Sequence, residues 1–277
     1  MATTHLPVVG GYPEGAAQTC RQDGWASGPI ATVAFITTAL VYMTWAAFQG
    51  THYYADPYLS PLYSPVIFTD LSAAGAAPMW HAWVGNWPAW WPAVLPLSPA
   101  LLILPFPGSF RFTCYYYRKA YYRSFAGSPP GCWVNPVAGK RDYKGETALM
   151  IFQNLHRYAM YFAVIFLFIL AYDAAISFHR VGEGFGIGVG SIVLTVNLFM
   201  LSAYTFGCHS FRHMVGGRID AMAGKLGSLN HVRWKFSTWF NERHMAMAWV
   251  SLFWVSFTDV YVRLVSMGII TDLNTWN

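Results

Sequence analysis

Long apolar runs separated by short polar segments dominate the hydrophobic pattern of the chain. A helix needs about 20 apolar residues to cross roughly 30 Å of hydrocarbon. The pattern predicts an all-α fold, an integral membrane bundle of five transmembrane helices that forms one domain over residues 1–277. Five prolines between residues 92 and 107 interrupt helical hydrogen bonding, so the second helix is expected to start late or to kink. The predicted spans are residues 28–50, 90–115, 148–178, 185–208 and 240–268.

Basic side chains gather in two of the connecting regions, residues 111–144 and 212–243, whereas the opposite loops carry almost only Arg180. By the positive-inside rule, the N-terminus and both basic regions lie in the cytoplasm, and the C-terminus lies outside. The chain is therefore expected to be a multi-pass protein of a bacterial plasma membrane. The segment 51–88, rich in Trp, Tyr and Pro, is expected to form an outer cap with an interfacial aromatic belt.

Composition agrees with a membrane protein, since 55% of residues are hydrophobic and only 10% are charged. The net charge of +5 does not indicate nucleic-acid binding, because the basic residues lie in short loops between apolar runs. The four cysteines form no CxxC pair and are interpreted as reduced structural thiols. Alternating glycines at 182–190 lack the strand that a dinucleotide-binding loop needs, so they are assigned to close helix packing.

Histidines form an inner polar layer at the cytoplasmic ends of three predicted spans. His156 and His244 lie near the starts of two parallel helices, and an antiparallel helix returns His209 and His213 to the same depth. Neutral imidazole is a good axial ligand for haem iron, and a bundle usually offers one His from each of two helices. His209 with His156 or His244 is the preferred haem b set, which leaves His213 to a headgroup or a quinone carbonyl. The alternative is that each histidine is a packed, hydrogen-bonded side chain.

Tyrosines at 115–122 with Arg118, and Trp239 with Asn241, lie at this same predicted level. A quinone needs hydrogen-bond donors for two carbonyl oxygens, a proton source and flat apolar walls. These residue types supply all three. Simple anchoring of Tyr and Arg at the headgroups is the alternative.

Carboxylates form an outer polar layer. Asp173 and Asp259 follow His156 and His244 by about 22–26 Å of helix, and Arg263 comes one turn after Asp259, within reach of both carboxylates. The layer is interpreted either as an ion pair that fixes two helices or as a proton-transfer group.

Several stretches of residues 110–270 resemble a known family: the single-chain, five-helix, cytochrome b-type membrane anchor of succinate dehydrogenase (respiratory complex II), in its actinobacterial form. The stretches are RFTCYYYRKAYYRSF at 111–125, YKGET at 143–147, QNLHRYAMY at 153–161, GCHSFRH at 207–213, and NERHMAMAWVSLFWVSFTDVYVRLVSMGII at 241–270.

The resemblance implies a complex in which a flavoprotein oxidises succinate, an iron–sulfur subunit relays the electrons, and this anchor reduces menaquinone. Two-haem members place a ligand His in four helices, whereas the first two spans here have none in their interiors, so no haem, one haem or two haems are all consistent with the chain. The resemblance also implies that Asp173 and Asp259, with Arg263, serve a transmembrane proton path. Assembly of the complex into a higher oligomer is possible. Candidate quinone-binding residues are Tyr117, Arg118, Arg157, Arg212, His213, Trp239 and Arg243.

Other classes compete with this interpretation. A transporter would use Asp173, Asp259 and Arg263 as a substrate site, but no inverted repeat is visible. A membrane di-iron hydroxylase would use the HxxxH pair at 209–213, but such enzymes need several histidine boxes. A purely structural anchor would show no dependence on quinone.

Overall fold

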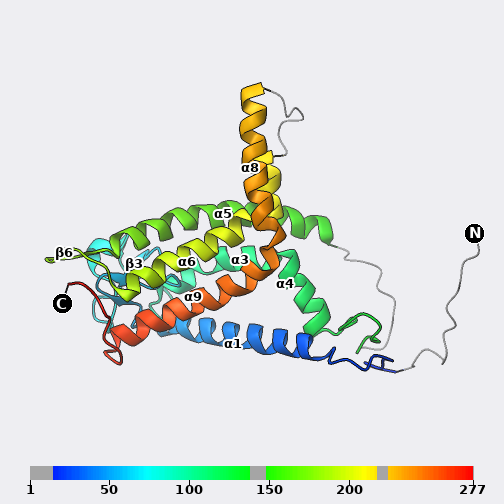
Figure 1. Cartoon of the computed structure of the whole chain (residues 1–277). Coiled ribbons are helices and arrows are strands. Elements are labelled where there is room, and N and C mark those ends of the chain that lie inside the picture. The colour runs from blue at the N-terminus through cyan, green and yellow to red at the C-terminus, as the bar shows by residue number, and fades with distance from the viewer. Residues whose placement is uncertain (1–14, 138–147, 217–223, 277) are drawn as a thin grey trace, which may run out of the picture. The chain divides into compact units, whose positions relative to one another are not determined.

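The computed structural model describes residues 15–137, 148–216 and 224–276, and it is mostly helical (Figure 1). The resembling stretch at 143–147 lies outside these residues. The chain divides into two compact units, residues 1–38 with 114–149 and residues 39–113 with 150–277. The helices are α1 (Ser27–Gln49), the 3-10 helix η1 (Met79–His81), α2 (Pro99–Ile103), α3 (Pro105–Thr113), α4 (Tyr115–Ala120), the π-helix η2 (Tyr121–Phe125), α5 (Leu149–Ile176), α6 (Val189–Phe206), α7 (His209–Gly216), α8 (Gly224–Glu242) and α9 (His244–Ser266).

The strands are two residues long and connect loops of the second unit. Strand β1 (Tyr54–Ala55) pairs antiparallel with β2 (Tyr58–Leu59), and β5 (His179–Arg180) pairs antiparallel with β6 (Gly184–Phe185). Strand β3 (Phe68–Thr69) pairs in parallel with β4 (Gly85–Asn86). These pairs are too small to alter the predicted helical class.

Four helices of the described residues are long and apolar enough to cross a membrane. They match the first, third, fourth and fifth predicted spans to within a few residues. Their bounds are Ser27–Gln49, Met150–Ile176, Val189–Phe206 and His244–Ser266.

The second predicted span, 90–115, differs from the structure. Residues 90–98 are not helical, so the predicted start at residue 90 is wrong. Helix α2 begins at Pro99, where a missing N–H costs nothing, and α3 begins again at Pro105. Hydrogen bonds from Leu104 N to Ala100 O (2.9 Å) and from Gly108 N to Leu104 O (2.8 Å) carry the chain across the break. The prolines thus shorten and kink this helix, and a fifth span is not confirmed.

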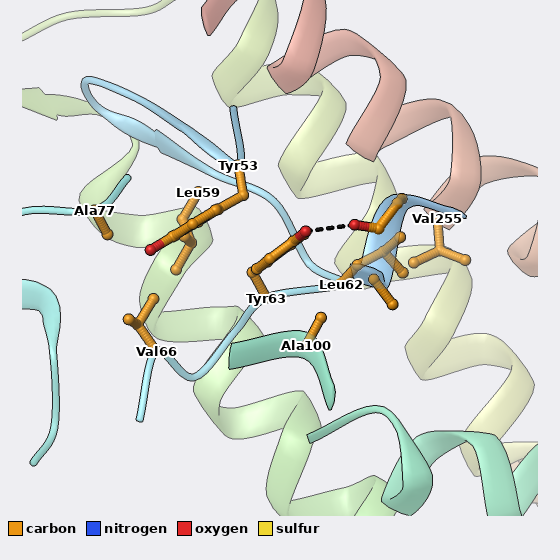
Figure 2. Close-up of a cluster of buried hydrophobic side chains, with 10 residues drawn as sticks. Tyr53, Leu59, Leu62, Tyr63, Val66, Ala77, Ala100 and Val255 are labelled. Carbon is orange, nitrogen blue, oxygen red and sulfur yellow. Dashed lines mark hydrogen bonds between the residues drawn. The ribbon is translucent and has the colours of Figure 1, made fainter. Parts of the chain in front are cut away.

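The segment that follows α1 enters the core of the second unit instead of only capping it. Tyr53, Tyr58, Leu59 and Tyr63 are each at most 2% exposed. Figure 2 shows Tyr53 and Tyr63 side by side, with ring centroids 4.3 Å apart, and the Tyr63 hydroxyl donating to Ala46 O at 2.5 Å. The end of α1 is therefore attached to this buried segment.

Helices α6 and α9 pack antiparallel against each other. The Tyr204 and His244 rings stack at one end, and Trp254 Nε1 donates to Val193 O at 3.1 Å further along. A Cβ on Gly190 would lie 2.6 Å from the Tyr58 ring, so a larger residue there would force Tyr58 out. Gly190 thus allows close packing of α6 against β2, and not against another helix as predicted.

Candidate functional site

An apolar cavity of about 410 Å³ lies in the second unit, with walls from α1, α2, α3, α5 and α6. Its size falls in the range of about 300–1,000 Å³ that is typical of small-molecule pockets. Its lining is apolar except for Thr44 and a polar end formed by Arg111, Tyr204 and Thr205. Such a cavity suits a largely apolar molecule with a polar group at one end.

Arg111 brings a positive charge to the polar end of the cavity. Its Nη1 donates to Ala248 O at 3.2 Å, and its Nη2 donates to Ser251 Oγ at 3.0 Å. Its Cζ lies 4.8 Å from the centroid of the Tyr204 ring. These contacts tie α3 to α9 and hold the guanidinium group in place.

A buried cluster, termed the inner cluster and formed by Phe110, His156, Tyr204, Cys208 and His244, lies behind this end. His156 Nε2 is 3.1 Å from Cys208 Sγ, and the His156 ring stacks on Phe110 at 4.7 Å. Phe110 meets Tyr204 edge-on at 5.3 Å, and Tyr204 stacks on His244 at 4.8 Å. Because Phe110 and Tyr204 also line the cavity, they connect it with the two histidines.

The structure does not bring His209 together with the buried His156 or His244, the preferred haem set, so the haem itself stays a prediction. The second ring nitrogen of His156, Nδ1, lies 2.9 Å from Thr113 Oγ1, so Thr113 and Cys208 contact both nitrogens. His209 is exposed and begins α7, so it does not join His156. No histidine is among the described residues that line the cavity. We therefore assign no reaction step to a haem.

Cys208 contacts His156 in this cluster, and the sequence did not predict that contact. A lone cysteine next to a histidine carries no spacing signal, and the chain was expected to present His209. Imidazole and thiolate are the ligand types that soft transition metals prefer. Within residues 15–137, 148–216 and 224–276, no group of three or more His, Cys, Asp or Glu side chains that could hold a metal ion is found.

The outer carboxylates take part in two separate contacts. Asp259 accepts hydrogen bonds from Tyr42 (2.5 Å) and Ser60, and it forms the predicted ion pair with Arg263, with an Nε–Oδ2 distance of 3.3 Å. Asp173 instead accepts a hydrogen bond from the Ser64 hydroxyl. In the described part of the chain, no ion pair joins Arg263 to Asp173.

The predicted quinone residues of the second unit lie around α7 and α8 and at the start of α5. Arg157 and His213 are exposed. Arg243 packs on Trp239, with Cζ 4.3 Å from the ring centroid, and Arg212 Nε donates to Thr238 Oγ1 at 3.0 Å. None of these residues lines the cavity described above.

The other two predicted quinone residues, Tyr117 and Arg118, are buried in α4 of the first unit. Arg111 and Tyr204, which do line the cavity, were missed. Arg111 had been counted only as an orientation charge, and Tyr204 lies inside an apolar run. An arginine within a predicted span was the available signal for this site.

Comparisons with known proteins identify the family. No curated protein matches the chain. A chain of the Mycobacterium smegmatis Sdh1 complex in the apo form is 35% identical and has the same fold, with a TM-score of 0.79; the match covers 94% of this chain and 95% of that one. The profile of the actinobacterial succinate dehydrogenase subunit SdhC matches residues 27–268. The chain therefore belongs to the actinobacterial SdhC family, the membrane-anchor subunits of succinate dehydrogenase.

Proposed function

We propose that this chain reduces menaquinone in the apolar cavity, with electrons that come from succinate. The observation that carries the proposal is the polar end of the cavity at Arg111 and Tyr204, beside otherwise apolar walls. A quinone has the matching chemistry, because two carbonyl oxygens accept hydrogen bonds while the ring and the isoprenoid tail are apolar. Binding of the ring at the polar end would leave the tail along α1 and α5.

Each residue at the polar end has a defined task in this proposal. Two-electron reduction of a quinone places negative charge on its oxygens before two protons arrive. The fixed guanidinium group of Arg111 would stabilise that charge, since its contacts with α9 orient it in advance. The hydroxyl groups of Tyr204 and Thr205 would donate hydrogen bonds to the carbonyl oxygen.

The partners follow from the proposed reaction. A flavoprotein subunit would oxidise succinate, and an iron–sulfur subunit would pass the electrons to this chain from the cytoplasmic side. This arrangement requires the N-terminus in the cytoplasm and a bacterial plasma membrane. It also assigns the docking of the iron–sulfur subunit to the basic residues that follow α3, outside α8.

The outer carboxylates supply the proposed proton path. Asp173 and Asp259 are buried, and each is hydrogen-bonded to a serine hydroxyl of the segment 51–66. Chains of hydroxyl and carboxyl groups can pass protons inward toward the quinone. If Asp173→Asn and Asp259→Asn each leave succinate oxidation and its uncoupler sensitivity intact, this path is excluded.

Replacement of Arg111 tests the proposed reaction. In the assembled complex, Arg111→Gln should lower kcat/KM for menaquinone by roughly 100-fold, the usual effect of losing a charge-stabilising donor. Succinate oxidation by a soluble dye, which takes electrons before the quinone, should stay unchanged. Arg180→Gln is the matched control, because Arg180 lies in β5, away from the cavity, and forms half-exposed ion pairs with Asp56 and Glu183. Unchanged menaquinone kinetics in Arg111→Gln would overturn the proposal.

A further inference from the structure

Helix α8 carries an exposed row of large apolar side chains along one face. Leu229, Val232, Phe236 and Trp239 are 45%, 62%, 55% and 51% exposed. Their spacing of three and four residues places them on a single side of the helix, termed the apolar stripe. An exposed apolar row of this length on a helix indicates a surface that is covered by something apolar.

The rest of the helix surface shows where this stripe points. Ser237 donates to Phe206 O at 2.7 Å and Asn241 donates to Gly207 O at 2.7 Å, which fixes the end of α8 to the end of α6. Trp234 packs under Arg212 of α7, with Cζ 4.8 Å from the ring centroid. The apolar stripe therefore faces away from α7.

Helix α8 crosses the direction of the membrane-spanning helices. Figure 1 shows it at a steep angle to α5, α6 and α9, starting beyond α5 and ending where α9 begins. It ends at Glu242, directly before α9 begins, and its 19 residues extend about 28 Å. A helix that lies across the spans at the level where they end lies in the plane of the membrane surface.

Basic side chains border the stripe on both sides. On a helix of 3.6 residues per turn, Arg233 falls beside Leu229, and Lys235 falls beside Trp239. Both are exposed. Long basic side chains at the edges of an apolar face can keep their charges among lipid phosphates while their stems rest on acyl chains.

We propose that α8 lies in the headgroup region of the leaflet at which α6 ends and α9 begins. Its apolar stripe enters the acyl chains, and Arg233 and Lys235 bind the phosphates of anionic lipids. The occupant is lipid and not a protein, because a protein partner would not need basic groups along both borders of the stripe. This inference is independent of the quinone proposal.

Site-specific quenching in the assembled complex tests this inference. Exposed Cys20 and Cys132 are replaced by Ser, and an environment-sensitive fluorophore is placed on Leu229→Cys or Phe236→Cys in the stripe. Glu242→Cys, at the exposed end of α8 outside the stripe, and Glu183→Cys, in an exposed loop, are the controls. The complexes are reconstituted in nanodiscs that contain phosphatidylglycerol, with and without doxyl-labelled acyl chains.

The proposal requires doxyl lipids to quench the two stripe positions several-fold more than the controls, and aqueous iodide to quench the controls more. Strong iodide quenching at the stripe would show that it faces water. Protection of the stripe from both quenchers would show that a protein covers it. Either result would overturn the proposal, and two independent stripe positions keep the test valid if one variant fails to assemble.

Discussion

Filling the cavity from Gly108 is the sharpest perturbation that the structure offers. Gly108 lines the cavity, and a Cβ built there meets nothing within 4 Å. A leucine adds four carbons where the quinone would bind. At about 0.8 kcal/mol per buried carbon, quinone binding should weaken by about 3 kcal/mol, or roughly 200-fold. Gly108→Ala adds one carbon, so binding should weaken only about fourfold.

The assay is steady-state menaquinone reduction by the purified complex with succinate as donor. KM for menaquinone should rise in the order wild type, Gly108→Ala, Gly108→Leu, whereas dye-coupled succinate oxidation stays constant. Gly28→Leu in α1 is the control, because its Cβ also meets nothing within 4 Å and it does not line the cavity. A Gly108→Leu complex with the menaquinone KM of the wild type would refute the reasoning.

Three further predictions follow from other parts of the structure. Arg263→Leu leaves Asp259 buried without its cation, so the complex should lose about 3–5 kcal/mol of stability in thermal unfolding. Adding Asp259→Asn should restore part of that stability. Equal melting temperatures of the single and double variants would contradict a stabilising role of the ion pair. Burial lowers the pKa of His81, so the unfolded chain binds protons more readily and the fold loses stability as the pH falls. Hydrogen-exchange protection factors of residues 51–86 should therefore decrease from pH 7 to pH 5. The His81→Gln variant should show a smaller decrease. A dithionite-minus-oxidised spectrum should lack the b-type α-band of the preferred haem set, because His209 is exposed and apart from the buried His156 and His244; a band at one haem per chain would show that the histidines rearrange.

Hydropathy predicted four long helices well, because four of the five apolar runs are long helices in the structure. It failed at residues 90–98, where proline chemistry outweighs apolar composition, although the prolines themselves predicted the late start and the kink. The buried segment around Tyr63 could not be foreseen from composition, since its tyrosines and serines are equally typical of an outer loop.

The sequence predicted the depth of the histidines along their helices, but it did not predict which direction each side chain faces. Counting residues placed His156 and His244 at one level, and the Phe110 and Tyr204 rings do connect them. Helix α6 ends at Phe206, so the chain direction changes just before the histidine pair of α7. That change brings Cys208 to His156 and leaves His209 exposed.

Contacts between residues that are far apart in the chain could not be predicted from the sequence either. The ion pair of Asp259 with Arg263 was predicted because one helical turn separates them. The Ser60 hydroxyl that donates to Asp259 lies 199 positions away in the chain, and no local pattern signals it. The same holds for the contact of Arg111 with Ser251, which orients the candidate quinone ligand.

Photo-labelling of the complete complex with an azido-menaquinone, followed by mass spectrometric mapping, tests the central claim most directly. Labels that compete with menaquinone should appear on the cavity wall, at residues such as Met43, Phe110 and Leu167. Competed labels confined to Trp239 and Arg243, with none on the cavity wall, would place the quinone at α8 and contradict the account.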